Sequence, residues 1–169
     1  MPREPLDLPF DPIARAGDIW DAKFGPAAAM RAATSVMRAQ QLLLARYDEI
    51  LKPHGLTFAR YEALVLLHFS HAGELPLSII GERLMVHPTS VTNIVDRLVK
   101  QGFAERHPNP KDGRGVLARL TALGRKTVKR ATADLTADGF GLDMYDEPAL
   151  DAIFGQLRAL RIAAGDFSI

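Results

Sequence analysis

The sequence predicts a mainly α-helical fold that carries one small β-hairpin. Apolar residues recur at helical spacing through most of the 169 residues. Between residues 103 and 120 this period gives way to two short strand-like runs around a loop rich in glycine and proline. With 47% hydrophobic and 24% charged residues, the composition is that of an average soluble protein of about one domain. The absence of cysteine from the sequence excludes disulfides, thiolate metal sites and cysteine nucleophiles.

The first 52 residues predict an arm followed by a long helix. Prolines punctuate residues 1–26, which favours an extended arm with one short helix at 12–24. A helix is expected over 27–52, because its apolar residues keep the helical period as far as Pro53 and Gly55, which end it. Such a helix is about 39 Å long at 1.5 Å per residue. It is longer than one small core needs, which indicates a second packing partner.

Shorter elements follow in the middle of the chain. Helices are expected at 58–71, at 78–85 with Ser78 as N-cap, and at 88–101 with Pro88 in the first turn. Strands are expected at 103–106 and 116–120, on either side of a hairpin loop at 109–115.

Further helices complete the C-terminal part. Thr121 is the predicted cap of a helix that ends near Asp138. Another helix is expected to open at Asp146 and to carry an apolar stripe that includes Phe154 and Leu160.

The net charge of +1 hides an uneven distribution along the chain. Residues 1–80 carry a net charge of −1, residues 81–130 carry +7, and residues 132–169 carry −5. A basic block inside a nearly neutral chain is typical of a surface that binds a polyanion. The alternative is a solvated helix face on which the cations cluster by chance.

Two short helices joined by a tight turn and followed by a β-hairpin predict a winged helix-turn-helix. The second helix has one apolar side, which is expected to pack on the body of the protein; it comprises Val91, Ile94, Val95, Leu98 and Val99. The other side begins with short uncharged side chains that are suited to base edges in a DNA major groove. Its members are Thr89, Ser90, Thr92, Asn93, Asp96, Arg97 and Lys100.

The hairpin gathers basic residues around a single turn. They are Arg106, His107, Lys111, Arg114 and Arg119. Arg114 stands between Gly113 and Gly115, a placement that suits insertion into a narrow minor groove. Asp112 is expected to brace the hairpin or to orient an arginine, and the alternative is a simple turn residue. Helix and wing together predict sequence-specific binding to double-stranded DNA. The candidate DNA-binding residues are Thr89, Ser90, Thr92, Asn93, Arg97, Lys111, Asp112 and Arg114.

These segments resemble the MarR family of bacterial transcriptional regulators. The resemblance rests on Leu56-Thr57, on Pro88-Thr89-Ser90-Val91-Thr92-Asn93-Ile94-Val95-Asp96-Arg97-Leu98, on Lys100 to Arg106, and on Asp112-Gly113-Arg114-Gly115 with Leu120-Thr121 and Gly124. It implies base recognition by Thr89, Ser90, Thr92 and Asn93, minor-groove contact by Arg114 and bracing by Asp112. It also implies an obligate homodimer formed by the terminal helices. Members usually repress transcription, and many release DNA when a small aromatic acid or another ligand binds.

The expected organisation follows from the elements and the resemblance. It comprises an N-terminal arm at 1–26, a dimerisation helix at 27–55, the winged helix-turn-helix at 56–121 and C-terminal dimerisation helices at 122–169. A small aromatic or phenolic effector is expected between the long helix and the helix at 58–71. Its predicted contacts are Arg46, Tyr47, Tyr61 and His68, and the alternative is that Tyr61 and His68 are core residues.

Other classes of protein are disfavoured. No cofactor or metal is expected, and the histidines are interpreted as packing or surface residues. An enzyme is not expected, because no Ser-His-Asp spacing, phosphate-binding glycine loop or paired-carboxylate pattern stands out. Neither a transmembrane run nor a secretory signal is present, so the expected location is the cytoplasm. The alternative function is a winged-helix module that binds protein and lacks DNA-binding activity.

Overall fold

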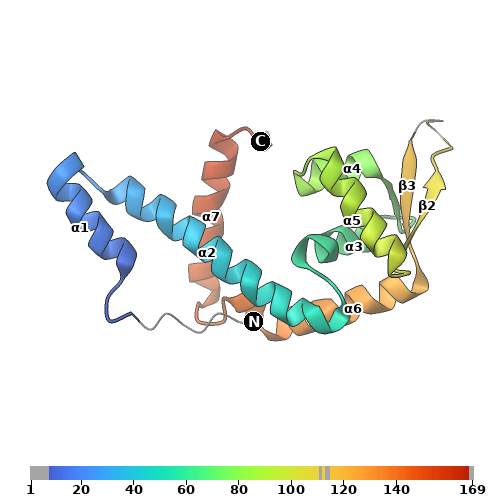
Figure 1. The fold of residues 1–169 in the computed structure, drawn as a ribbon, viewed down its shortest axis with the longest axis horizontal. Coiled ribbons are helices and arrows are strands. Elements are labelled where there is room, and N and C mark those ends of the chain that lie inside the picture. Colours follow the sequence, from blue (N-terminus) through green and yellow to red (C-terminus); the bar gives the residue numbers. More distant parts are fainter. Residues whose placement is uncertain (1–7, 111, 113–114, 168–169) are drawn as a thin grey trace. The chain divides into compact units, whose positions relative to one another are not determined.

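The computed structural model describes residues 8–110, 112 and 115–167 (Figure 1). The chain divides into two compact units, Met1–Ala45 and Arg46–Ile169. The described fold is mainly helical with one small antiparallel sheet, as the sequence predicts. No helix among the described residues combines the length and the apolar character that a bilayer crossing requires.

The first unit contains α1 (Pro12–Phe24) and most of α2 (Ala28–Leu51). Arg31 of α2 joins the two helices through an ion pair of 2.8 Å with Asp18. Gly17 provides the space for its guanidinium group, because a Cβ atom on Gly17 would lie 2.1 Å from Arg31 Nε. The prediction of a short helix at 12–24 is confirmed.

The second unit holds the remaining elements, whose order agrees with the predicted helices and strands. They are η1 (Lys52–His54), α3 (Phe58–Phe69), β1 (Glu74–Pro76), α4 (Leu77–Leu84), α5 (Pro88–Lys100), β2 (Ala104–Pro108), β3 (Val116–Leu120), α6 (Ala122–Ala137), η2 (Gly139–Gly141) and α7 (Glu147–Ala163). Figure 1 shows α3, α4 and α5 grouped beside the sheet, with α6 continuing from β3.

The core of this unit lies where α3, α5 and α6 face one another. Leu64 and Leu67 of α3, Leu98 of α5, and Val128 and Leu135 of α6 have almost no exposed surface. Burying one such side chain contributes about 1.5–3 kcal/mol to folding. The apolar sides of α3, α5 and α6 are therefore the surfaces that pack together.

The sheet has three strands in the order β1-β3-β2, all antiparallel. The predicted hairpin is present, with Ala104 opposite Leu120 and Pro108 opposite Val116. Strand β1 is absent from the sequence-based prediction. It has three residues, ends in Pro76 and pairs with a partner distant in sequence, so no local pattern marks it.

The N-terminal ends of the helices show which of the predicted N-cap residues act as caps. Thr121 caps α6 as predicted, since its Oγ1 accepts a hydrogen bond from Gly124 N at 2.9 Å. Asp146, where the sequence predicts that the last helix opens, caps α7 by accepting a hydrogen bond from Ala149 N at 3.0 Å. The prediction for Ser78 is wrong. Helix α4 begins at Leu77 directly after β1, and the last extended residue is Pro76, so Ser78 already lies within the first turn.

Candidate nucleic-acid interface

Helix α5 is held in place by its apolar side, which packs against α3 and α4. Val91 and Leu98 are fully buried there. Ile94 is half-buried and Val99 is 36% exposed. The packed side is therefore narrower than the sequence predicts, and more of the helix surface faces solvent.

The opposite side of α5 carries the predicted base-contacting residues. Thr89, Ser90, Thr92, Asn93 and Arg97 are all exposed. Within residues 8–110, 112 and 115–167, none of these side chains makes a hydrogen bond or an ion pair. His87 precedes the helix, and its Nδ1 accepts from Thr89 N at 3.3 Å. Ser90 N and Val91 N both donate to the carbonyl oxygen of His87, at 2.8 and 3.2 Å, so the N–H groups of the first turn are satisfied within the chain.

Two cations of the basic block are engaged within the fold itself. Arg106 of β2 pairs with Asp96 of α5 at 2.9 Å and donates a hydrogen bond to the carbonyl of Thr92 at 3.3 Å. Arg119 of β3 pairs with Glu74 of β1 at 2.7 Å. These contacts fasten the hairpin to α5 on one side and to β1 on the other. The sequence places both arginines in the basic cluster but gives no signal for their carboxylate partners.

The hairpin loop contains three of the candidate residues. Lys111 and Arg114 lie outside the described residues, so their DNA contacts stay predictions. Asp112 N donates to Asn109 O at 3.2 Å, and Gly115 N donates to Asp112 O at 2.9 Å. These backbone bonds place Asp112 in the turn, and the role of its side chain stays a prediction.

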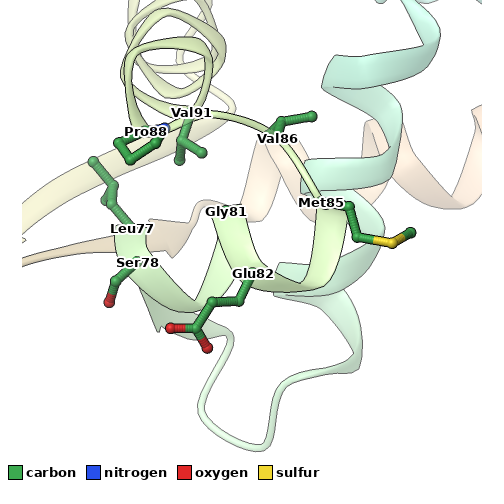
Figure 2. A pocket seen from close by; sticks show the side chains of 8 residues that line it. All are labelled: Leu77, Ser78, Gly81, Glu82, Met85, Val86, Pro88 and Val91. Atoms are coloured by element: carbon green, nitrogen blue, oxygen red, sulfur yellow. The ribbon is translucent and has the colours of Figure 1, made fainter. Parts of the chain in front are cut away.

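A pocket of about 410 Å³ lies beside the turn between α4 and α5 (Figure 2). Pro88 and Val91 line it from α5, and Leu77 and Met85 line it from the α4 side. Gly81 brings the two helices close, because a Cβ atom there would lie 3.1 Å from Val91 Cγ2.

The predicted effector residues have polar partners within the chain. Arg46 binds the carboxylate of Asp138, and this hydrogen bond lowers the pKa of Asp138. Tyr47 is buried, and its hydroxyl donates to the carbonyl oxygen of Phe140 at 2.9 Å. Burial raises the pKa of Tyr47. These two residues therefore tie the end of α2 to the segment that follows α6.

Tyr61 and His68 lie seven positions apart on α3, which is about 10 Å along the helix axis. Tyr61 is a core residue whose hydroxyl lies 3.0 Å from Thr132 Oγ1. His68 Nδ1 lies 3.2 Å from Arg125 Nη1. Burial, followed by the charge of Arg125, lowers the pKa of His68. For Tyr61 these contacts favour the alternative of a core residue, and the effector role of all four residues stays a prediction.

Comparisons with known proteins place this geometry in a family. A family model described as the MarR family matches residues 54–115. The HTH-type transcriptional regulator YhbI of Bacillus subtilis is 33% identical over 119 residues, which cover 70% of this chain and 72% of YhbI. The MarR family transcriptional regulator Sco5413 of Streptomyces coelicolor is 60% identical, with a TM-score of 0.78, and the match covers 83% of this chain and 98% of Sco5413.

A more distant structure shows the same fold. Sco3205, a MarR family transcriptional regulator of Streptomyces coelicolor solved in complex with DNA, is 23% identical with a TM-score of 0.71. The match covers 82% of this chain and 90% of Sco3205. These relatives are transcriptional regulators, which confirms the prediction that this chain is not an enzyme. The winged helix-turn-helix, the family model and the relatives agree, and the chain therefore belongs to the MarR family of transcriptional regulators.

Proposed function

We propose that this regulator binds a pseudo-palindromic operator as a homodimer, and that one α5 helix of each subunit enters the major groove. The observation that carries the proposal is the polar side of α5, where exposed Thr89, Ser90, Thr92 and Asn93 face solvent. Their side chains suit direct contacts with base edges, and Asn suits adenine in particular. The DNA complex of Sco3205, which has the same fold, supports this use of the helix-turn-helix.

The remaining candidate residues would act on the DNA backbone and the minor groove. Arg97 is exposed on the same side of α5 and would neutralise phosphate. Lys111 and Arg114 add positive charge to the wing, and Arg114 between its two glycines suits a narrow minor groove. Asp112 would keep the turn in shape.

Exposed apolar helix faces support the homodimer. Helix α7 has no buried residue, although its stripe includes Phe154, Leu157 and Leu160. Helix α2 exposes Val36 and Met37 within the first unit. Apolar patches of this kind mark protein–protein interfaces in soluble proteins. A second copy of the same chain would cover them and would place two recognition helices about one DNA turn apart, roughly 10 bp.

The proposal includes repression that a small aromatic or phenolic effector relieves. CouR of Rhodococcus jostii, which has the same fold at 24% identity and a TM-score of 0.68, was solved with p-coumaroyl-CoA bound. The match covers 82% of this chain and 94% of CouR. An aromatic acyl ligand in that protein supports a search for phenolic effectors here.

A binding experiment tests the DNA function directly. Fluorescent duplexes from upstream of the protein's own gene and a scrambled duplex are titrated with the full chain over a salt series. We expect one upstream site to bind about 10³-fold or more tightly than the scrambled duplex, with an affinity that falls as salt rises. Equal and weak binding to all duplexes at every salt concentration would favour the protein-interaction module. A promoter–reporter assay then distinguishes repression from activation.

A further inference from the structure

The C-terminal end of the recognition helix α5 is joined to the start of α3 by one side chain that the proposed function does not use. Gln101 is the C-cap of α5. Its Nε2 donates a hydrogen bond of 2.6 Å to the carbonyl oxygen of Gly55, and its Oε1 accepts one of 3.0 Å from Arg60 Nη1. Because a carbonyl only accepts and a guanidinium only donates, the two bonds define both the position and the orientation of this amide.

Both partners of Gln101 are themselves held in place. Gly55 has a left-handed φ of 71°, and a Cβ atom there would lie 3.0 Å from Gln101 Nε2. The backbone at this position therefore needs glycine to meet the amide. Arg60 is half-buried, and its Nε donates to Thr57 Oγ1 at 3.2 Å. Gln101 is thus bonded to two groups whose own positions are restricted.

The same end of α5 also contacts the start of α6. Gly102, with a φ of 75°, turns the chain from α5 toward β2. The hydroxyl of Thr121 donates to the carbonyl oxygens of Gly102 and Phe103, at 2.7 and 3.1 Å. The end of α5 is therefore held by α3 and by the cap of α6, at the point where the chain continues into the wing.

A small rotation at this end would disturb contacts with base edges. Asn93 and Gln101 are eight positions apart, which is about 12 Å along the helix axis. A tilt of about 5° about the C-cap would move Asn93 by about 1 Å, whereas N–H···O hydrogen-bond lengths span only about 0.5 Å. Val91 and Leu98 hold α5 on the body of the protein, but hydrophobic burial has no directional preference.

Contacts with phosphate are less sensitive to such a tilt. They are electrostatic and independent of sequence, whereas the bases are recognised through hydrogen bonds of defined geometry. A change in the orientation of α5 should therefore reduce the preference for the operator more than it reduces the affinity for DNA in general.

We propose that Gln101 is a positioning residue for base recognition. Its bonds to Gly55 and Arg60 hold α5 at the angle that the exposed side of the helix needs in the major groove. The positioning role rests on the DNA-binding function proposed above, whereas the attachment of α5 to α3 does not.

Gln101→Met tests this role, because methionine has a similar length and lacks the amide. Anisotropy titrations of the full chain measure its affinity for operator and random duplexes. We expect operator binding to weaken at least about tenfold and binding to random DNA to stay within about twofold of the wild type. An unchanged operator affinity, or equal losses on both duplexes, would overturn the proposal.

Gln41→Met is the matched control. Gln41 on α2 also accepts a hydrogen bond from an arginine, Arg38, at 3.2 Å, but it lies in the unit Met1–Ala45. Both DNA affinities of this variant should stay within about twofold of the wild type. A loss of operator preference equal to that of Gln101→Met would contradict a role specific to the end of α5. Thermal unfolding checks that each variant is folded.

Arg60→Met gives an independent test from the opposite partner. It should lower the ratio of operator affinity to random-DNA affinity, which corrects for the lost charge because that loss affects both duplexes. The double variant Arg60→Met/Gln101→Met should lower this ratio no further than Gln101→Met does, because both substitutions remove the same bond. Losses that multiply in the double variant would overturn the shared role of the two residues.

Hydrogen exchange without DNA tests the attachment itself. Gly102 N and Phe103 N donate to the carbonyl oxygens of Val99 and Leu98, both at 2.9 Å. These amide protons should exchange faster in Gln101→Met than in the wild type, because the end of α5 opens more easily. Unchanged exchange would overturn the attachment. If exchange responds as expected but the wild type prefers no duplex, the proposed DNA function fails while the attachment stands.

Discussion

Asn93 is the side chain on which base specificity is expected to depend most. Its amide can both donate to and accept from one adenine, and it is exposed without an intramolecular partner in the described residues. Asn93→Ala should weaken binding to the operator by about 1–3 kcal/mol and leave binding to random DNA nearly unchanged. Anisotropy titrations with both duplexes measure this difference. The same loss on both duplexes would show that Asn93 does not contact bases.

Glu62 of α3 carries a testable consequence for stability. Burial raises the pKa of its carboxyl group, and no partner compensates for the charge among the described residues. A carboxyl with a raised folded-state pKa favours folding below its unfolded pKa, about 4.3. This contribution is lost as pH rises through the folded-state value. Glu62→Gln should therefore raise the free energy of unfolding at pH 7 and leave it little changed near pH 4.

Urea denaturation at the two pH values measures this effect. Glu49→Gln, which changes an exposed carboxylate on α2, serves as the control and should alter stability little at either pH. A Glu62→Gln variant that is less stable than the wild type at pH 7 would contradict the interpretation.

At the scale of single residues, the sequence predicts hydrogen bonds that a side chain makes to its own helix. It does not predict which residue distant in sequence will be the partner of a side chain. Thr121 is a predictable cap because a cap contacts its own helix. The partner of Tyr61 is Thr132, 71 positions away, and no sequence pattern identifies it. The prediction for Ser78 is wrong for a related reason, because a strand that the sequence does not reveal fixes where α4 begins.

At the scale of elements, the Arg106–Asp96 ion pair links β2 to the recognition helix α5. Breaking this pair is expected to have opposite effects on the binding of random DNA and of operator DNA. Both side chains are partly exposed, so the pair contributes roughly 0–1 kcal/mol to stability. Asp96→Asn removes a negative charge from α5 and should strengthen binding to random DNA. If the pair positions the wing, operator binding should weaken in the same variant, because the hairpin is held less firmly against α5.

Anisotropy titrations on operator and random duplexes separate the two effects, and the thermal midpoint should shift by a few degrees at most. Stronger binding on both duplexes would mean that Asp96 acts through its charge alone and has no positioning role.

The helices and the hairpin are predictable because the spacing of apolar residues along each segment indicates its secondary structure. The apolar spacing on α5 and the caps of α6 and α7 are local properties of the chain. Strand β1 is not predictable in this way, because Glu74 pairs with Arg119 across 45 positions. A cleft that His54 of η1 and Arg130 of α6 line also escapes sequence reasoning, since its two walls come together only when α6 packs against η1.

For the whole molecule, the exposed stripe of α7 predicts a stable dimer. Phe154 is 59% exposed, and an aspartate in its place would put a charge into the proposed interface. Phe154→Asp should shift the protein from dimer to monomer in sedimentation experiments at micromolar concentration. It should also weaken operator binding, because a monomer contacts one half-site. Gln156→Asp adds the same charge on another side of α7 and is the matched control. A wild-type monomer would contradict the dimer itself.

Some parts of the candidate site can be predicted from local sequence, and other parts depend on contacts between distant residues. The exposed side of α5 is predictable, because helical geometry alone decides which of its residues share a face. The four predicted effector residues share a chemical character that suits an aromatic ligand, and the structure places Tyr61 and His68 about two helical turns apart.

The three-stranded sheet has a further consequence for how copies of this protein associate. Its central strand, β3, is paired on both sides, so the outer edges belong to β1 and β2. One edge strand is three residues long and ends in Pro76, and the other is rich in charge and ends in Pro108. Short, charged and proline-containing edges are poor templates for strand addition, which guards against aggregation and fibril growth. Self-association through β-structure is thereby disfavoured, and the helices are left as the surfaces through which two copies meet.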